Sequence, residues 1–150
     1  MQVFTPYPEP YKTACCLDPK RLNKQIIECK QILSAIYGKS KGWKNHPVTK
    51  QYTPHEIYLQ KYLLCLMAYK EGRIYDAQTH SHYAMLYKPA FLTKDFCDQH
   101  KRRLYTKDKE FYKQFEAYGT SEENWYYVDG ELLKYNRGKK NSEKKSDISL

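Results

Sequence analysis

The sequence lacks an apolar run long enough to cross a membrane. Its longest uninterrupted apolar stretch, Tyr62 to Tyr69, falls far short of the roughly 20 residues that a membrane-spanning helix requires. The amino-terminal residues also lack the basic segment and apolar core of a secretion signal. We therefore expect an intracellular protein with no membrane partner, located in the cytoplasm or nucleoid, or in the nucleus or virion if its source is viral.

Cysteine patterns typical of disulfide frameworks and metal sites are also missing. Five cysteines are an odd number, and the neighbours Cys15 and Cys16 are poorly placed to bridge each other. No Cys-x-x-Cys occurs, and the only close histidine pair, His80 and His82, lacks a second ligand pair at zinc-site spacing. The sequence therefore predicts reduced thiols and no metal site.

Acidic residues are scarce relative to basic ones. The chain has 26 Lys and Arg against 17 Asp and Glu, which gives a formal net charge of +9 and favours a polyanionic partner. Residues 136–150 hold five Lys and Arg and two Asp and Glu, so most of this surplus lies on residues 1–135. A hydrophobic content of 41% is too high for a disordered chain. We expect one domain over 1–135 and a Lys-rich disordered tail over 136–150.

Alternating strand patterns are not evident, whereas helix signals recur along the chain. Asp18 and Thr53 each precede a proline, which places a capping side chain before a residue suited to the first helical position. Three prolines in residues 1–12 favour an extended arm. These signals predict an all-α fold, a single compact domain of about four helices with an extended amino-terminal arm and a disordered basic tail. The predicted helices cover about 19–37, 54–72, 94–105 and 108–118, and 38–52 and 73–92 are predicted to be irregular.

The first predicted helix has an apolar face and a polar face. Its apolar residues recur every three or four positions, which predicts a buried stripe. They are Leu22, Ile26, Cys29, Leu33 and Ile36. The polar side carries Arg21, Lys24 and Glu28 at spacings of three and four, so Lys24 and Glu28 can touch. This side is either a solvated ion-pair surface or a functional site.

A loop after this helix has the composition of a nucleic-acid contact. Trp43 supplies a ring that could stack on a base, and Lys44, Asn45 and His46 supply groups that bind phosphate. The alternative is a capping loop with Trp43 in the core. Both interpretations stay open at the level of sequence.

A second basic cluster falls on the third predicted helix. It consists of His100, Lys101, Arg102 and Arg103. It would meet two or more phosphates if it shares a face with Arg21 and Lys44. The alternative is an exposed helix end, where cations interact favourably with the helix dipole.

Four segments in order along the chain carry a resemblance to a known family. They are residues 4–7, 17–28, 42–47 and 100–102. With these segments the sequence resembles the pyrimidine dimer DNA glycosylase/endonuclease V family, and it looks closer to the bacterial and viral branch of that family than to its phage enzyme. The resemblance covers most of residues 1–135 and implies a compact all-α fold that acts on double-stranded DNA.

The resemblance also implies a bifunctional DNA repair enzyme. Such an enzyme cuts the glycosidic bond of a damaged pyrimidine and then breaks the strand by β-elimination, as an AP lyase. The implied nucleophile is a free amino-terminal amine, and Glu28 matches the family's assisting glutamate. An α-amine suits this role because roughly 10% of it is unprotonated at pH 7, against well under 0.1% for an ordinary lysine. A neighbouring carboxylate can stabilise the oxocarbenium charge and move protons.

Three amines are candidates for the nucleophile. The first is the α-amine of Met1, because methionine is commonly retained before a residue as large as Gln2. The second is the α-amine of Gln2 after removal of Met1, although an exposed glutamine could cyclise and lose its nucleophilicity. The third is the side chain of Lys24. The candidate catalytic residues are therefore Met1, Gln2, Lys24 and Glu28.

Two other functions fit the same residues. One is an enzyme of this fold that acts on another modified base, RNA or a nucleotide. The other is a non-catalytic nucleic-acid-binding or packaging protein, in which the basic tail releases counterions. We expect no cofactor, because chemistry with an amine and a carboxylate needs none, and no obligate protein partner is evident.

Overall fold

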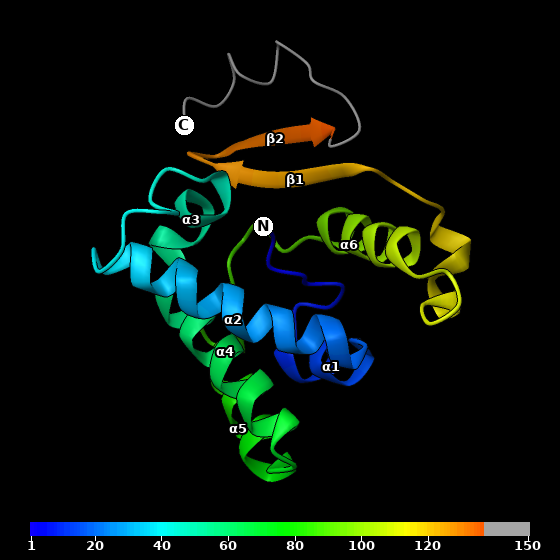
Figure 1. The fold of residues 1–150 in the computed structure, drawn as a ribbon, viewed down its shortest axis with the longest axis horizontal. Helices are drawn as coiled ribbons and strands as arrows, with labels where there is room; N and C mark the ends of the chain where they lie inside the picture. Colours follow the sequence, from blue (N-terminus) through cyan, green and yellow to red (C-terminus); the bar gives the residue numbers. More distant parts are fainter. Residues whose placement is uncertain (137–150) are drawn as a thin grey trace.

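Helices account for most of the computed structural model, which describes residues 1–136 (Figure 1). The α-helices are α1 (Pro10–Cys16), α2 (Pro19–Ile36), α3 (Pro47–Tyr52), α4 (Glu56–Lys70), α5 (Ile74–Met85) and α6 (Lys94–Lys107). Two 3-10 helices, η1 (Thr53–His55) and η2 (Lys113–Tyr118), and an antiparallel hairpin of β1 (Glu123–Val128) and β2 (Glu131–Asn136) complete the described chain. No helix within residues 1–136 is long and apolar enough to cross a membrane.

Helix α2 forms where the sequence predicts it. Asp18 caps the helix by accepting a hydrogen bond from the Arg21 amide at 3.4 Å, and Pro19 occupies the first helical position. The predicted apolar stripe is buried except for its last member, Ile36, which is half-buried. This stripe packs on α4, so the polar side of α2 faces away from the core.

Helix α4 is the central helix of the fold. Tyr58, Tyr62 and Leu66 are fully buried, and α4 contacts α1, α2 and α5. Its start differs from the prediction. Thr53 donates its hydroxyl hydrogen bond to the Thr49 carbonyl at 2.7 Å, so it leads into η1 and does not cap α4.

Helix α5 occupies a segment that was predicted to be irregular, and this prediction was wrong. The helix buries small side chains, namely Ala77, Ser81 and Ala84, in its contact with α4. A large side chain such as Tyr75 stays exposed. A helix that packs through small residues leaves no apolar stripe in the sequence, so the helical period was not visible.

The hairpin of β1 and β2 corrects the all-α prediction, because the fold is mostly helical with a small two-stranded sheet. Asp129 and Gly130 join the strands with positive φ angles of 53° and 79°, as a two-residue hairpin turn requires. Only Tyr126 is buried in β1, so the strand lacks the alternating apolar pattern that marks a half-buried strand.

Shorter segments also differ from the prediction. The arm ends before Lys12, because Pro10 starts α1. Residues 47–52 form α3 in place of the predicted loop, because Pro47 occupies its first position and His46 caps it. The predicted fourth helix over 108–118 is a turn followed by the 3-10 helix η2.

The predicted disordered tail lies outside the described residues except for Asn136, which ends β2.

The amino-terminal arm runs through the middle of the fold. Figure 1 marks the amino terminus beneath β1 and between α2 and α6. The side chains of Gln2, Val3, Phe4 and Thr5 are buried. The first residues are therefore a core element, and the fold positions them beside the polar side of α2.

Candidate active site

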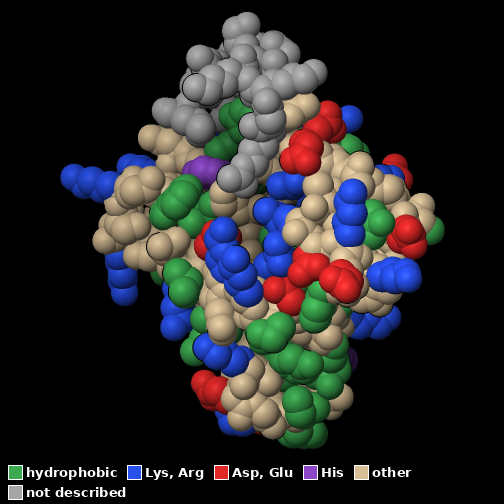
Figure 2. Space-filling view, turned by 45° about the vertical axis from the view of Figure 1, so that its right-hand side comes forward, with side chains coloured by type: hydrophobic (Ala, Val, Ile, Leu, Met, Phe, Trp, Pro, Cys, Tyr) green, Lys and Arg blue, Asp and Glu red, His purple; other side chains and the backbone are tan. Residues whose placement is uncertain are grey.

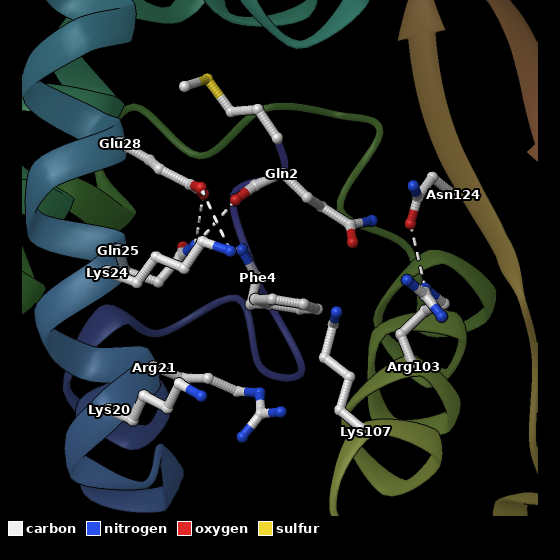
Figure 3. Close-up of a pocket in the computed structure, with 11 residues that line it drawn as sticks. Gln2, Phe4, Lys20, Arg21, Lys24, Gln25, Glu28, Arg103, Lys107 and Asn124 are labelled. Atoms are coloured by element: carbon white, nitrogen blue, oxygen red, sulfur yellow. Dashed lines mark hydrogen bonds and ion pairs between the residues drawn. The ribbon is translucent and has the colours of Figure 1, made fainter. Parts of the chain in front are cut away.

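A polar cavity lies between α2, the amino-terminal arm and α6. Its volume is about 260 Å³, and Lys and Arg side chains gather in and around this hollow (Figure 2). Figure 3 shows the lining from close range. The lining residues are Met1, Gln2, Phe4, Lys20, Arg21, Lys24, Gln25, Glu28, Arg103, Lys107 and Asn124. With one carboxylate among five cations, this lining favours a ligand that carries negative charge.

All four predicted catalytic residues line this cavity. The Lys24 ammonium lies 3.9 Å from the Glu28 carboxylate, which confirms that these two side chains touch. Their exposure differs, because the Lys24 side chain is 66% exposed and the Glu28 side chain only 13%. Glu28 is therefore a carboxylate held close to the protein, whereas Lys24 reaches toward solvent.

Side chains from three elements hold the backbone of the arm in place. Tyr126 of β1 donates to the Met1 carbonyl at 2.8 Å, and Gln25 of α2 donates to the Gln2 carbonyl at 2.7 Å. Gln25 also accepts from the Phe4 amide at 2.9 Å, and Tyr62 of α4 donates to the Phe4 carbonyl at 2.6 Å. These contacts fix the amino-terminal end of the chain at the cavity, beside Glu28.

Arg21 is oriented by its neighbours at the start of α2. Its guanidinium donates to the Asp18 carboxylate at 3.1 Å and lies over the Tyr112 ring at 5.9 Å. Burial raises the pKa of Asp18, but hydrogen bonds from Tyr112 and Arg21 outweigh it and hold the pKa below its usual value. Figure 3 shows Arg21 pointing into the cavity from α2, with Lys107 of α6 reaching in from the opposite wall.

Several lining residues were not predicted from the sequence. They are Phe4, Lys20, Gln25, Lys107 and Asn124. Gln25 carried a usable signal, because it lies three residues before Glu28 on the same helical side. Lys107 and Asn124 carried none, because they reach the cavity only through the packing of α6 and β1.

The predicted basic cluster on α6 makes its contacts inside the protein. His100 is 1% exposed, and its Nδ1 accepts from the Thr5 amide at 2.6 Å. Burial and the nearby Arg103 lower the pKa of His100 to about 3, so the ring is neutral at pH 7. The other ring nitrogen, Nε2, lies 3.3 Å from the Gln2 side-chain nitrogen.

The rest of this cluster points in different directions. The Lys101 ammonium pairs with Asp98 at 3.2 Å and lies over the Tyr118 ring at 4.7 Å. Arg102 donates to the Tyr118 carbonyl at 3.0 Å. Arg103 alone lines the cavity, where its Nε donates to Asn124 at 3.0 Å. The four residues therefore do not share one face with Arg21.

The loop of residues 42–47 caps α3, as one interpretation predicted, but Trp43 is half-buried and does not lie in the core. His46 caps α3 by accepting from the Val48 amide at 3.0 Å, and its ring contacts Trp43 and Tyr126. Burial, with a contribution from the charge of the amino terminus, lowers the pKa of His46 to about 4. Lys44 and Asn45 are exposed. The loop is a capping structure that also presents polar side chains to solvent.

The described lining of the cavity contains no cluster of metal ligands and no thiol. Among the described residues, no group of three or more His, Cys, Asp or Glu side chains is arranged to hold a metal ion. The five cysteines are free, and none of them lines the cavity. The chemistry available here comes from amines, one carboxylate and guanidinium groups.

Comparison with known proteins bears on this cavity directly. Residues 1–81 match a family model described as pyrimidine dimer DNA glycosylase. The matched segment contains the arm and α2, which together supply eight of the eleven lining residues. No curated protein and no solved structure matches the chain.

Proposed function

Because the chain belongs to the pyrimidine dimer DNA glycosylase family, we propose that it removes damaged pyrimidines from duplex DNA and then cleaves the strand at the abasic site. The family implies a DNA substrate and supports glycosylase activity. One observation carries the proposal further, namely that the amino-terminal residue and Glu28 line the same cavity. The proposed site of action is the compartment that contains the DNA, which is the cytoplasm or nucleoid, or the nucleus or virion if the source is viral.

The chemistry follows from an amine beside a carboxylate. The unprotonated α-amine of Met1, or of Gln2 after removal of Met1, attacks the sugar C1′ atom while the glycosidic bond breaks. The bonding electrons leave with the base, which takes up a proton. Glu28 stabilises the positive charge that develops on the sugar, in a site that the protein partly shields from water.

Strand cleavage requires a second set of proton transfers. The amine and the ring-opened C1′ form a Schiff base, which makes the C2′ protons more acidic. Loss of one C2′ proton expels the 3′ phosphate by β-elimination, and in this proposal the carboxylate of Glu28 accepts that proton. Water then hydrolyses the Schiff base and releases the amine.

The cavity cations are the proposed phosphate contacts. Arg21 and Arg103 were predicted from the sequence, and Lys20 and Lys107 join them in the lining. The loop residues Trp43, Lys44, Asn45 and His46 remain proposed DNA contacts on a neighbouring surface. His100 is buried, Lys101 and Arg102 are paired with neighbouring protein groups, and a direct role for these three residues in DNA binding stays a prediction from the sequence.

Borohydride trapping tests the proposal and identifies the nucleophile. The intact protein is incubated with a duplex that carries a thymine dimer or an abasic site, reduced, and analysed by mass spectrometry. An adduct at the amino-terminal residue supports the proposed mechanism and shows whether that residue is Met1 or Gln2. An adduct at Lys24 retains the reaction and moves the nucleophile.

A negative result has a defined meaning. If the wild-type protein binds duplex DNA but forms no adduct with either substrate, the lyase proposal fails. Glycosylase assays on other modified bases and on RNA then separate a changed substrate from a protein that only binds nucleic acid.

A further inference from the structure

Gln25 is a buried amide that makes hydrogen bonds through both its oxygen and its nitrogen. Its side chain is 2% exposed and lies in the cavity wall on α2. The Oε1 atom accepts from the Phe4 amide at 2.9 Å, and the Tyr62 hydroxyl, which donates to the Phe4 carbonyl, lies 3.2 Å from it. The Nε2 atom donates to the Gln2 carbonyl at 2.7 Å and to the Glu28 carboxylate at 3.4 Å. Both polar atoms of the amide are therefore engaged by neighbouring groups.

These partners fix which way the amide points. The Phe4 amide can only donate, so it must face the Gln25 oxygen, and the Gln2 carbonyl can only accept, so it must face the nitrogen. No other uncharged side chain of this length offers both groups in this arrangement. Figure 3 shows Gln25 between the arm and Glu28, with dashed lines to both.

The contacts of Gln25 join the two halves of the proposed catalytic apparatus. Two of its bonds hold the backbone on either side of Val3, and a third reaches the Glu28 carboxylate. We propose that Gln25 is a positioning residue, which sets the amino-terminal amine and the Glu28 carboxylate at the separation that the reaction needs. This inference rests on the proposed function and adds to it a residue that acts through two others.

Positioning of this kind has a kinetic signature. A displacement of about 1 Å between reacting groups costs on the order of 100-fold in rate, whereas binding through the cavity cations does not depend on it. Gln25→Met keeps the length of the side chain and removes its hydrogen bonds to Gln2, Phe4 and Glu28. We expect its single-turnover rate of adduct formation on an abasic duplex to fall on the order of 100-fold. The affinity for the same duplex should stay within about 2-fold of wild type, because no phosphate contact is lost.

A matched variant separates positioning from loss of stability. Gln99 is also a helical glutamine that is 2% exposed, and its Nε2 donates to the Ser121 hydroxyl at 2.8 Å and the Glu123 carbonyl at 2.7 Å. It does not line the cavity. Gln99→Met should lower the denaturant midpoint as Gln25→Met does, while its adduct rate per folded molecule stays within about 2-fold of wild type.

The variant Gln25→Glu supplies a second readout, the pH dependence of the adduct rate, which a loss of stability would not produce. Its carboxylate can accept from Phe4 but cannot donate to Gln2, and it repels Glu28. Protonation of the introduced carboxylate at low pH removes its repulsion with Glu28 and provides one hydrogen-bond donor for the Gln2 carbonyl. The wild-type rate divided by the variant rate should therefore shrink as the pH falls from 8 toward 5, at temperatures where both proteins are folded.

The outcomes distinguish this inference from the function on which it rests. If wild type forms no adduct, the proposed function fails and this inference fails with it. If wild type forms the adduct and folded Gln25→Met reacts at the wild-type rate, only the positioning role is overturned. A rate ratio for Gln25→Glu that does not change with pH overturns it as well.

Discussion

Helices α2 and α6 face each other across the cavity, and both carry a run of basic and polar residues, but they use these residues differently. On α2, Arg21 and Lys24 project into the cavity with Glu28. On α6, His100 holds the arm and Lys101 pairs with Asp98. The chemistry of a side chain is therefore decided by the element that lies opposite it. A basic run in a sequence identifies candidates for ligand binding but does not separate them from residues that hold the fold together.

The largest expected effect tests the α2 side of this comparison. Glu28→Gln should lower strand cleavage and adduct formation on the order of 10³-fold, because the amide can neither accept the C2′ proton nor balance charge on the sugar. Binding of the same duplex, measured by fluorescence anisotropy, should persist. Equal cleavage by the variant and the wild type would contradict a catalytic role for α2 and favour a contaminating nuclease or another site.

A pH experiment tests the α6 side. The pKa of His100 is lowered from 6.5 to about 3 in the folded protein, so the unfolded chain binds more protons between these values. Stability is therefore complete above pH 6.5 and falls as the pH drops below it, by up to about 1.4 kcal/mol per pH unit for each such histidine. His46, whose pKa is lowered to about 4, acts in the same direction.

His100→Asn isolates the contribution of the α6 histidine. The asparagine oxygen can accept from the Thr5 amide in place of Nδ1, but the side chain does not titrate. Urea unfolding at pH 5, 6 and 7 should give a shallower loss of stability for the variant, by up to about 1.4 kcal/mol per pH unit. If the free energy of unfolding changes equally steeply with pH in the two proteins, His100 titrates freely in the folded state and does not hold the arm.

A pair of arginine variants compares the two helices directly. Arg21→Gln removes a cation from the cavity wall, so we expect about 10-fold weaker duplex binding at 0.1 M salt and a salt slope that is smaller by about 1. Arg102 is already engaged by the Tyr118 carbonyl and the Gln99 side chain, so Arg102→Gln should change the affinity by about 2-fold at most. An equal loss in both variants would place Arg102 against the DNA together with the cavity cations and remove the contrast between the two arginines.

The predictable parts of the fold were those with a local signal in the sequence. Asp18 and Pro19 define the start of α2, and the apolar sequence of α4 marks it as the central helix. Helix α5 was missed because its contact surface consists of small residues such as Ala77. The hairpin was missed although Asp129 and Gly130 form a strong turn signal, because one buried residue in β1 gives no alternation.

The candidate site was predictable where its residues lie on one helix. The spacing of Arg21, Lys24 and Glu28 places them on one side of α2, and the structure brings all three to the cavity. Lys107 could not be predicted, because its position depends on how α6 packs. The burial of His100 was equally invisible, since it depends on the path of the amino-terminal arm through the core. Tertiary packing decides these cases, and no local pattern encodes it.

The smallest expected effect concerns Lys24, the α2 residue that is most like a surface lysine. Its side chain is 66% exposed, against 12% for Lys101 of α6, and its contact with Glu28 is a long ion pair of 3.9 Å. Such exposed pairs contribute at most about 1 kcal/mol, so Lys24→Met should slow adduct formation by about 5-fold or less. The adduct should remain at the amino terminus.

Lys30→Met is the matched control, because Lys30 is an exposed lysine of α2 that does not line the cavity. It should leave the rate and the site of the adduct unchanged. Complete loss of the adduct in Lys24→Met, with Lys30→Met active, would assign the nucleophile to the lysine side chain. The arm would then serve to shape the cavity, and the polar side of α2 would supply both the amine and the carboxylate.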